Sequence, residues 1–274
     1  MEFTINRDVF LKSLSHAHGI IEKKNALPIL SNVLIEAKNS KIKVTATDLD
    51  LIYSEEISLQ NLQKEGSTTT SASILYDILR KLEPNSQVEF SLESTNKLKM
   101  ISGNSKFNLL CISSDNFPLS DETINQKTFE ISSQKILRLL NKTRISISND
   151  ETRHYLNGVY LHKTKLDNRV FLSGVATDSH RLSSSSLEID SNTNFEPIIL
   201  PKKTIYQLIA LLEQDTNVVK ISNNKSKIKF EMTSGILISK VIDGRFPDYS
   251  KVVPKENDKV LKLKLNEFKN SIER

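Results

Sequence analysis

Apolar residues recur along this chain at two spacings, one typical of helices and the other of strands. The helical spacing places apolar residues three or four positions apart, so that they line one face of a helix. It occurs in residues 7–18, 72–82, 131–143 and 202–213. Ser132 or Ser133 is available to cap the third of these helices. Pro201 stands just before the fourth, where its missing N–H group does no harm.

Alternating apolar and polar residues, typical of half-buried strands, occupy much of the sequence between and after these helices. The clearest examples are residues 41–46, 88–92, 97–101 and 227–230. Each half of the chain is therefore predicted to hold two helices and about eight short strands. This content indicates an α+β fold, with the helices on one face of antiparallel sheets.

The two halves of the chain repeat one another. Ala46-Thr47-Asp48 recurs 130 residues later as Ala176-Thr177-Asp178. Residues 75–82 match 205–212 and residues 97–100 match 227–230 at the same offset, while Phe117-Pro118 returns as Phe246-Pro247 at an offset of 129. Four matches in the same order exclude chance. A period this long is outside the solenoid range and indicates two copies of a whole domain.

The repeat predicts where the domains lie. We expect a first domain over residues 1–125 and a second over 126–255. Residues 256–274 resemble the beginning of a third, with a strand from Val260, a helix cap at Asn266 and the first turns of a helix. Because a domain of this type cannot fold from so few residues, we expect the third copy to be cut short.

Composition and charge narrow the class of protein. Lys and Arg number 38 against 33 Asp and Glu, a mild excess that permits binding to a polyanion without requiring it. The chain has no run of about 18 apolar residues, and its start lacks the layout of a signal peptide. The single cysteine, Cys111, lies in an apolar run and is predicted to be a core residue. A reducing, cytoplasmic setting fits these features.

Asp178, His180 and Arg181 form the strongest candidate for a catalytic or metal cluster. An Asp-x-His pattern offers at most two metal ligands, fewer than a zinc site needs, and no second His-rich motif accompanies it. With seven glycines, the chain also lacks a glycine-rich phosphate loop. We therefore predict a protein without catalytic activity, metal or cofactor, and a hydrolase built on Asp178 and His180 remains the weakest hypothesis. Asp178, like Asp48 in the first copy, is predicted to cap a local turn.

Four stretches of the sequence resemble the bacterial sliding clamps, the beta subunits of DNA polymerase III. They are residues 27–30, 153–158, 175–182 and 241–249. The resemblance implies near-identical domains with helices facing inwards, in a homodimer that closes a six-domain ring around double-stranded DNA. It also implies a processivity factor that docks the catalytic subunit of DNA polymerase III, the clamp loader, other polymerases and repair proteins.

The resemblance implies that cations on the inward helices contact DNA. Lys135, Arg138 and Lys142 lie at i, i+3 and i+7, on one helical stripe. The full predicted set is Lys24, Arg80, Lys135, Arg138, Lys142, Lys202 and Lys203. From spacing alone, a solvated helix face is the simpler interpretation. Contacts of this kind reach phosphates, so binding should be weak, independent of sequence and strongly dependent on salt.

The resemblance also implies a hydrophobic cleft that takes a short extended peptide from the partner proteins. Its residues would be Arg153, Leu156, Thr177, His180, Arg181, Leu182, Pro247, Lys251 and Val252. Lys251 stands where relatives often have arginine, which weakens a bidentate contact. Ser179 replaces a common glycine. Asp150 and Glu151 place acidic groups in the loop before Arg153, where the family offers an uncharged polar contact to DNA.

Residues 105–109 resemble the edge strand by which the first domain joins the next subunit. The predicted interface residues are Lys106, Phe107 and Leu109, although alternation alone is equally typical of ordinary core residues. Two functional hypotheses remain open. One is a processivity clamp, and the other is a truncated clamp-derived module that binds peptides without encircling DNA.

Overall fold

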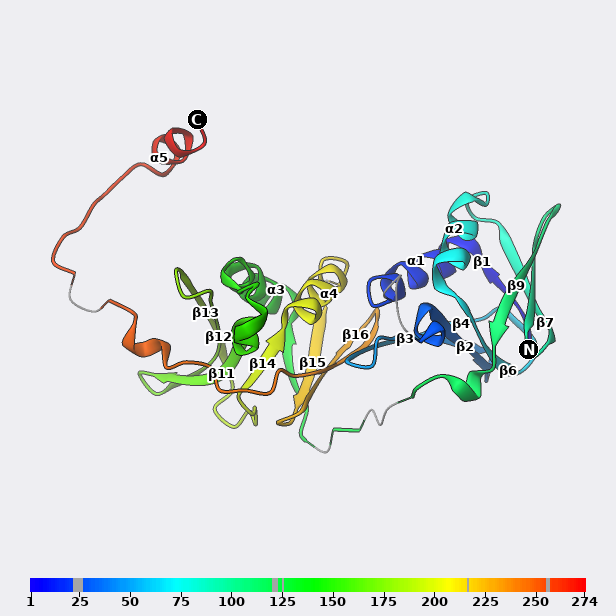
Figure 1. The fold of residues 1–274 in the computed structure, drawn as a ribbon, viewed down its shortest axis with the longest axis horizontal. Coiled ribbons are helices and arrows are strands. Elements are labelled where there is room, and N and C mark those ends of the chain that lie inside the picture. The colour runs from blue at the N-terminus through cyan, green and yellow to red at the C-terminus, as the bar shows by residue number, and fades with distance from the viewer. Residues whose placement is uncertain (22–26, 120–122, 125, 216, 255–256) are drawn as a thin grey trace. The chain divides into compact units, whose positions relative to one another are not determined.

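The computed structural model describes residues 1–274 apart from 22–26, 120–122, 125, 216 and 255–256. It divides into two compact units, Met1–Gly244 and Arg245–Arg274. The first unit contains the paired helices and the strands of both copies of the predicted repeat, and each copy sets its helices against antiparallel sheet (Figure 1). The α+β prediction is confirmed.

All four predicted helices are present in the first unit. They are α1 (Arg7–His18), α2 (Ala72–Lys81), α3 (Ser133–Thr143) and α4 (Lys202–Leu212). The third begins later than predicted because the residues before it form a strand. Ser132 holds the N-cap position without a side-chain cap bond, and the hydroxyl of Ser133 instead donates to the carbonyl of Asn217. Within the described residues, no helix is both long enough and apolar enough to cross a membrane.

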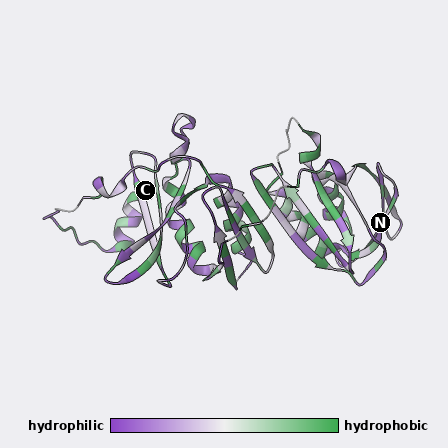
Figure 2. Ribbon diagram, turned by 90° about the horizontal axis from the view of Figure 1, so that it is seen from below, coloured by the Kyte–Doolittle hydropathy of each residue, from purple (hydrophilic) through white to green (hydrophobic). Residues whose placement is uncertain are grey.

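The strands of the first copy are β1 (Glu2–Asn6), β2 (Asn32–Lys38), β3 (Lys41–Thr47), β4 (Leu51–Ser58), β5 (Asn61–Lys64), β6 (Gly66–Ser71), β7 (Gln87–Ser94), β8 (Lys97–Ser102) and β9 (Ser105–Ile112). Those of the second are β10 (Phe129–Ser132), β11 (Gly158–Leu166), β12 (Arg169–Thr177), β13 (Leu182–Ile189), β14 (Ile198–Pro201), β15 (Val218–Asn223), β16 (Lys227–Met232) and β17 (Gly235–Lys240). Hydrophobic and hydrophilic residues alternate along many of them (Figure 2), as half-buried strands require.

The two copies share one sheet. β17 of the second copy pairs antiparallel with β4 of the first, with Leu237 opposite Tyr53 and Ser239 opposite Leu51. This pairing completes a sheet in the order β10-β15-β16-β17-β4-β3-β2-β6-β9-β8-β7-β1-β5, beside a smaller sheet in the order β13-β12-β11-β14. Backbone hydrogen bonds therefore cross from one copy to the other.

Apolar side chains from helices and strands form the core of each copy. Phe10 of α1 packs edge-on against Phe90, with 5.4 Å between ring centroids, and Phe90 stacks on Phe3 at 5.0 Å. Complete burial of such a side chain contributes roughly 1.5–3 kcal/mol. Cys111 is 9% exposed and in the core, as predicted, and burial raises the pKa of its thiol.

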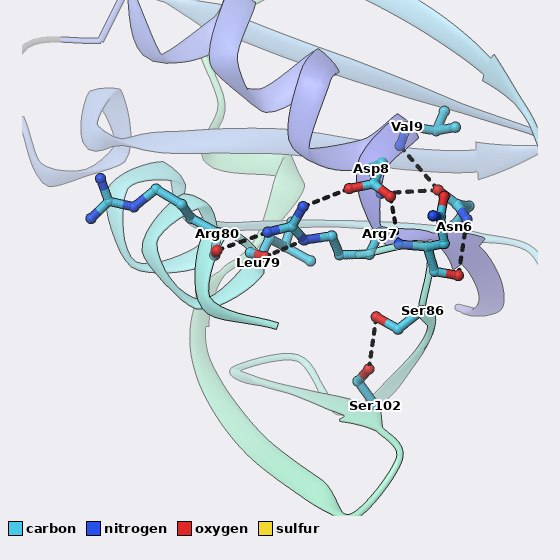
Figure 3. A network of polar contacts seen from close by, with 9 residues as sticks. Asn6, Arg7, Asp8, Val9, Leu79, Arg80, Ser86 and Ser102 are labelled. Carbon is cyan, nitrogen blue, oxygen red and sulfur yellow. Dashed lines mark hydrogen bonds and ion pairs between the residues drawn. The ribbon is translucent and has the colours of Figure 1, made fainter. Parts of the chain in front are cut away.

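Arg7 connects the start of α1 to the end of α2 (Figure 3). Its Nε donates to the carbonyl of Leu79 at 2.6 Å and its Nη2 to the carbonyl of Arg80 at 2.7 Å. The last carbonyls of a helix have no partner within the helix, so the guanidinium satisfies two of them. Asn6 caps α1 by accepting from the N–H of Asp8 at 2.9 Å. The guanidinium of Arg7 therefore links the N-terminal end of α1 to the C-terminal end of α2.

The second unit contains the short turn Tyr249–Lys251 and the helix α5 (Leu265–Ile272). The strand predicted from Val260 is wrong, since residues 260–264 have no regular structure, whereas the helix predicted after it is present as α5. Asn266 is not the cap: Lys264 holds that position and Asn266 lies in the first turn. A strand forms only against a neighbour, and the described residues of this unit contain none.

Candidate functional site

The candidate cleft centres on the turn between β12 and β13, and the same turn occurs between β3 and β4. Asp178 Oδ1 accepts from the backbone N–H groups of His180 and Arg181, both at 3.0 Å. Asp48 makes the two corresponding bonds in the first copy, at 3.0 and 2.7 Å. The prediction that both aspartates cap local turns is confirmed.

Thr177 closes this turn from the other side. Its hydroxyl donates to the carbonyl of Arg181 at 2.8 Å and accepts from the N–H of Ser179 at 3.1 Å. Ser179 has a φ of 79° and its counterpart Leu49 a φ of 80°. Positive φ is strained for residues other than glycine, so the side-chain bonds of the turn must outweigh that strain.

The carboxylate of Asp178 is fully engaged. Besides the two backbone N–H groups, it pairs with Arg181 Nε at 2.9 Å. The N–H groups of Arg181 and His180 hold the pKa of Asp178 at about 2, well below its usual range. A carboxylate so stabilised is a poor general base. Among the described residues, no group of three or more His, Cys, Asp or Glu side chains is placed to hold a metal ion.

Arg153 brings a second element to the turn. It lies in the 3-10 segment Glu151–Leu156, and its Nη1 donates to the hydroxyl of Ser179 at 2.6 Å. Its Nε donates to Asp150 at 2.8 Å. Hydrogen bonds from Thr152 and Arg153 lower the pKa of Asp150 to about 2. The acidic residue in this loop therefore orients Arg153 towards the turn.

The structure thus unites six of the predicted cleft residues on one region of the first unit. Leu156 is buried, at 2% exposed, whereas the side chain of Arg181 is 63% exposed. Pro247, Lys251 and Val252 belong to the second unit, and their place in the same cleft stays a prediction.

Sequence reasoning missed two contributors to this region. Ser179 was noted only as a replacement for glycine, yet its hydroxyl is the partner that holds Arg153. His154 Nε2 contacts the carbonyl of Asp243 at 3.1 Å, which ties the segment to the end of the unit. The only signal in the sequence is that His154 and Asp243 belong to two of the family-like stretches.

The predicted cationic stripe lies on one face of α3. Lys135, Arg138 and Lys142 are exposed, while Ile136 and Leu139 on the opposite face are 1% exposed. All three cations line a groove of about 280 Å³ between α3 and β13. None of the three forms an ion pair in the part of the chain that the structure describes, so their charge is available to a partner.

The other predicted DNA contacts have neighbours within the chain. Arg80 pairs with Asp77 at 3.4 Å on the surface. Lys202 Nζ donates to Asn149 at 2.5 Å. Lys203 Nζ pairs with Asp48, which connects the second copy to the first. Lys24 lies outside the described residues.

Polar side chains reinforce the joint between β4 and β17. Tyr53 Oη contacts His16 Nδ1 at 3.1 Å and Glu55 Oε2 at 3.0 Å, and it donates to the carbonyl of Ser234. His16 Nε2 contacts Gln214 at 3.2 Å. Burial, and then the Glu55 carboxylate, raise the pKa of Tyr53, so its hydroxyl stays a donor. Residues of both copies therefore meet in one network around the buried Tyr53 and His16.

β9 carries the predicted interface residues Lys106, Phe107 and Leu109. It pairs with β8 over residues 105–110 and with β6 at Cys111 and Ile112. Among the described residues, no strand pairs with the other edge of 105–110. Leu109 is 5% exposed and belongs to the core, whereas Phe107 is partly exposed. Phe107 lines a cavity of about 420 Å³ with Ile74, Ile78 and Leu82 of the α2 region.

Two family models match the chain. The N-terminal domain of the DNA polymerase III beta subunit matches residues 1–121, and the central domain of the same subunit matches residues 130–248. Among curated relatives, the beta sliding clamp of Caulobacter vibrioides is 35% identical over all of this chain and 74% of its own length. The beta sliding clamp of Escherichia coli is 31% identical with the same coverage.

Solved structures agree with these matches. A Caulobacter crescentus beta sliding clamp superimposes with a TM-score of 0.96 at 35% identity, over 100% of this chain and 73% of that one. A sliding clamp from Bartonella birtlesii bound to griselimycin gives a TM-score of 0.90 at 39% identity, over 94% of this chain and 69% of that one.

Proposed function

Because this chain belongs to the family of DNA polymerase III beta subunits, the bacterial sliding clamps, we propose that it tethers replication proteins to double-stranded DNA in the cytoplasm. In this role it acts as a scaffold without catalytic activity. The observation that carries the proposal is the repeat itself, two α+β copies joined edge to edge through β17 and β4. The proposed domains are residues 1–125, 126–255 and the start of a third at 256–274.

The DNA-facing surface is proposed to be the set of helix cations. Lys135, Arg138 and Lys142 support this best, because they are exposed and available. We propose that the positive charges of Arg80, Lys202 and Lys24 also attract the DNA phosphates. Lys203 would interact with both DNA and Asp48. Removing one cation that neutralises a phosphate should reduce the slope of log affinity against log salt by about 0.9. Replacing the three α3 cations with glutamine tests this, with Lys165→Gln as the exposed control.

The turn region of the second copy is proposed to bind a short extended peptide that carries leucine or phenylalanine. Polymerases, the clamp loader and repair proteins would present such segments. The support is geometric: the twin turn in the first copy has the same backbone, yet only the second carries His180 and Arg181, with Arg153 held beside them. Apolar anchors on the peptide, flanked by the cationic side chains of Arg153 and Arg181, suit this mode of recognition.

Peptide binding is the experiment that tests the proposal. A fluorescent peptide with leucine and phenylalanine anchors should bind the 274-residue chain, and His180→Ala with Arg181→Ala should weaken it by at least about tenfold, ~1.4 kcal/mol. Lys165→Ala on the β11–β12 hairpin is the matched control. Unchanged affinity in the double variant, with an intact fold by circular dichroism, would remove the peptide site from this turn.

The free edge of β9 is proposed to be a ring joint. The 130-residue offset relates Phe107 to Leu237, whose strand makes the joint inside the chain. Lys106 and Leu109 flank it on the same strand. An edge strand with an apolar plug is suited to a reversible contact between molecules.

A further inference from the structure

A cleft of about 820 Å³, here called the β10 slot, lies between β10 and residues 187–194 of the second copy. In the first copy the corresponding place is filled, because β5 pairs antiparallel with the outer edge of β1, with Leu62 opposite Phe3 and Asn61 opposite Thr4. The segment between β13 and β14, which the structure describes in full, contains no strand equivalent to β5. Within the described residues, β10 is therefore an edge strand with β15 on one side only.

One difference in sequence accounts for the open slot. β1 and β10 each lead directly into the first helix of their copy, so they are equivalent strands. At the 130-residue offset, Leu62 of β5 corresponds to Asn192. Leu62 packs against the core of the first copy, whereas an asparagine at this position gains little from burial. The second copy therefore keeps the edge of β10 but lacks the apolar strand that covers it in the first.

The outer edge of β10 presents backbone groups to the slot. The N–H of Ser133 donates to the carbonyl of Asn217 at 2.9 Å, and hydrogen-bonded pairs alternate along an antiparallel ladder. The backbone groups of Thr128 and Glu130 therefore point away from β15, and both residues line the slot. We propose that the β10 slot binds an extended segment of a partner protein by adding it to β10 as a further antiparallel strand.

The two faces of the slot differ in character, because successive residues of a strand point to opposite faces. The inner face is apolar and packs against the core, through Phe129, Ile131, Leu187 and Ile189. The outer face carries exposed carboxylates, those of Glu130, Glu188 and Asp190. A strand bound between β10 and β13 therefore meets apolar groups on one side and negative charge on the other. The partner segment that fits has apolar residues alternating with lysine or arginine.

The carboxylates of the outer face are only weakly neutralised within the chain. Glu130 and Glu188 have distant cations, Lys220 and Arg169, each 3.8 Å away. Asp190 forms no ion pair in the part of the chain that the structure describes. The lining also contains two lysines, Lys127 and Lys135. Exposed ion pairs contribute little affinity each, so the backbone ladder and the apolar face supply the binding, and the excess of carboxylates selects a basic segment over an acidic one.

The β10 slot is separate from the surfaces proposed above. The joint between the copies uses Leu51–Ser54 of β4. Their counterparts at the 130-residue offset are residues 181–184, and none of these lines the slot. Arg181 of the turn region precedes β13 and Asp190 follows it. Nine residues of extended chain separate the two, which is roughly 30 Å at about 3.3 Å for each residue.

Fluorescence anisotropy with a labelled peptide, Lys-Leu-Lys-Val-Lys-Leu-Lys, tests the proposal on the 274-residue protein. In the proposed strand the lysines lie opposite Thr128 and Glu130, so their N–H groups form the ladder to β10. Methylation of the lysine amide nitrogens should therefore weaken binding by about tenfold or more. Methylation of the leucine and valine amides, the matched control, should have a smaller effect. Hydrogen exchange at the amides of Thr128 and Glu130 should slow when the peptide is added.

Charge is tested on both partners. Glutamate in place of every lysine of the peptide should weaken binding by about tenfold or more. On the protein, Glu130→Lys with Asp190→Lys should have an effect of similar size. Glu83→Lys, a change at an exposed carboxylate of the first copy, is the matched control and should leave the affinity unchanged. Circular dichroism verifies the fold of each variant.

Strand addition is refuted if the two methylated peptides bind equally well, or if Thr128 and Glu130 exchange at the same rate with and without peptide. Equal binding of the lysine and glutamate peptides refutes the choice of a basic partner. The variant His180→Ala with Arg181→Ala separates this site from the turn region. It should bind the alternating peptide as the wild type does, and loss of binding in that variant would place the peptide at the turn and overturn the inference.

Discussion

Tyr53→Phe is the sharpest test of how the two copies are held together. The substitution removes one oxygen from a fully buried ring and leaves its shape unchanged. That oxygen contacts His16 at 3.1 Å and Glu55 at 3.0 Å, and donates to the carbonyl of Ser234. The single phenol hydrogen serves one acceptor at a time, so the variant leaves one partly buried acceptor without its donor.

The expected loss of stability follows from the one acceptor that is left without a donor. A buried acceptor left without a partner costs about 1–3 kcal/mol, and His16 still contacts Glu55, so we expect a loss of about 2 kcal/mol in the free energy of unfolding. For a chain of this size, each kcal/mol lowers the Tm by about 2–4 °C. Urea unfolding and thermal scans measure both quantities.

Tyr76→Phe is the matched control. The Tyr76 ring packs against His18 with 5.2 Å between centroids, and its hydroxyl has no hydrogen-bond partner among the described residues. It should change stability by less than about 0.5 kcal/mol. If Tyr53→Phe were equally silent, the buried network would contribute nothing to the joint and backbone pairing alone would hold it. Faster hydrogen exchange confined to β4 and β17 in Tyr53→Phe would locate the loss at the joint.

Three further predictions concern the turns and the second copy. The pKa values of Asp150 and Asp178 are lowered from 3.8 to about 2. The stability that these carboxylates contribute is therefore present above pH 4 and is lost as the pH falls towards 2. Asp178→Asn should reduce the dependence of stability on pH in this range, as measured by urea unfolding. Asp48→Ala removes the carboxylate oxygen that accepts from the backbone N–H groups of Asp50 and Leu51, and should cost about 1–3 kcal/mol by the same assay. Gly158→Ala should cost about 1–3 kcal/mol by overpacking, because its new Cβ would lie 2.2 Å from the carbonyl oxygen of Leu200. A Tm equal to that of the wild type would contradict the close approach of β11 and β14.

Much of the fold is predictable because its signals are local. Residues 7–18 carry a helical spacing, and α1 spans Arg7–His18. The repeated Ala-Thr-Asp motif predicts a repeated turn, since a threonine and an aspartate satisfy backbone groups only two to four residues away. Short-range chemistry of this kind is written into adjacent residues.

The joint between the copies is not predictable in that way. His16 and Gln214 lie 198 residues apart, and no pattern around either one indicates the contact. Lys203 was predicted as a DNA contact, and its ion pair with Asp48 was not foreseen, because that pair depends on how the two copies meet. The segment from Val260 has the alternation of a strand, and alternation cannot supply the neighbouring strand that its hydrogen bonds require.

The candidate site also combines features that the sequence predicts with contacts that it does not. The stripe on α3 follows from helical geometry, so the common face of Lys135, Arg138 and Lys142 was predictable. The bond from Arg153 to Ser179 was not, because it joins two segments whose proximity depends on the packing of β12 and β13 against the chain before them.

The twin turns also bear on how one half of a duplicated protein acquires a role that the other lacks. In each turn, the threonine and the aspartate make the closing bonds through their own side chains, and the two residues that follow the aspartate donate backbone N–H groups to them. Side chains at those intervening positions are therefore free to change without altering the path of the chain. Leu49 and Asp50 in the first copy, and Ser179 and His180 in the second, are two solutions on one backbone. The duplicated turn therefore keeps one backbone conformation in both copies, while its exposed side chains differ between them.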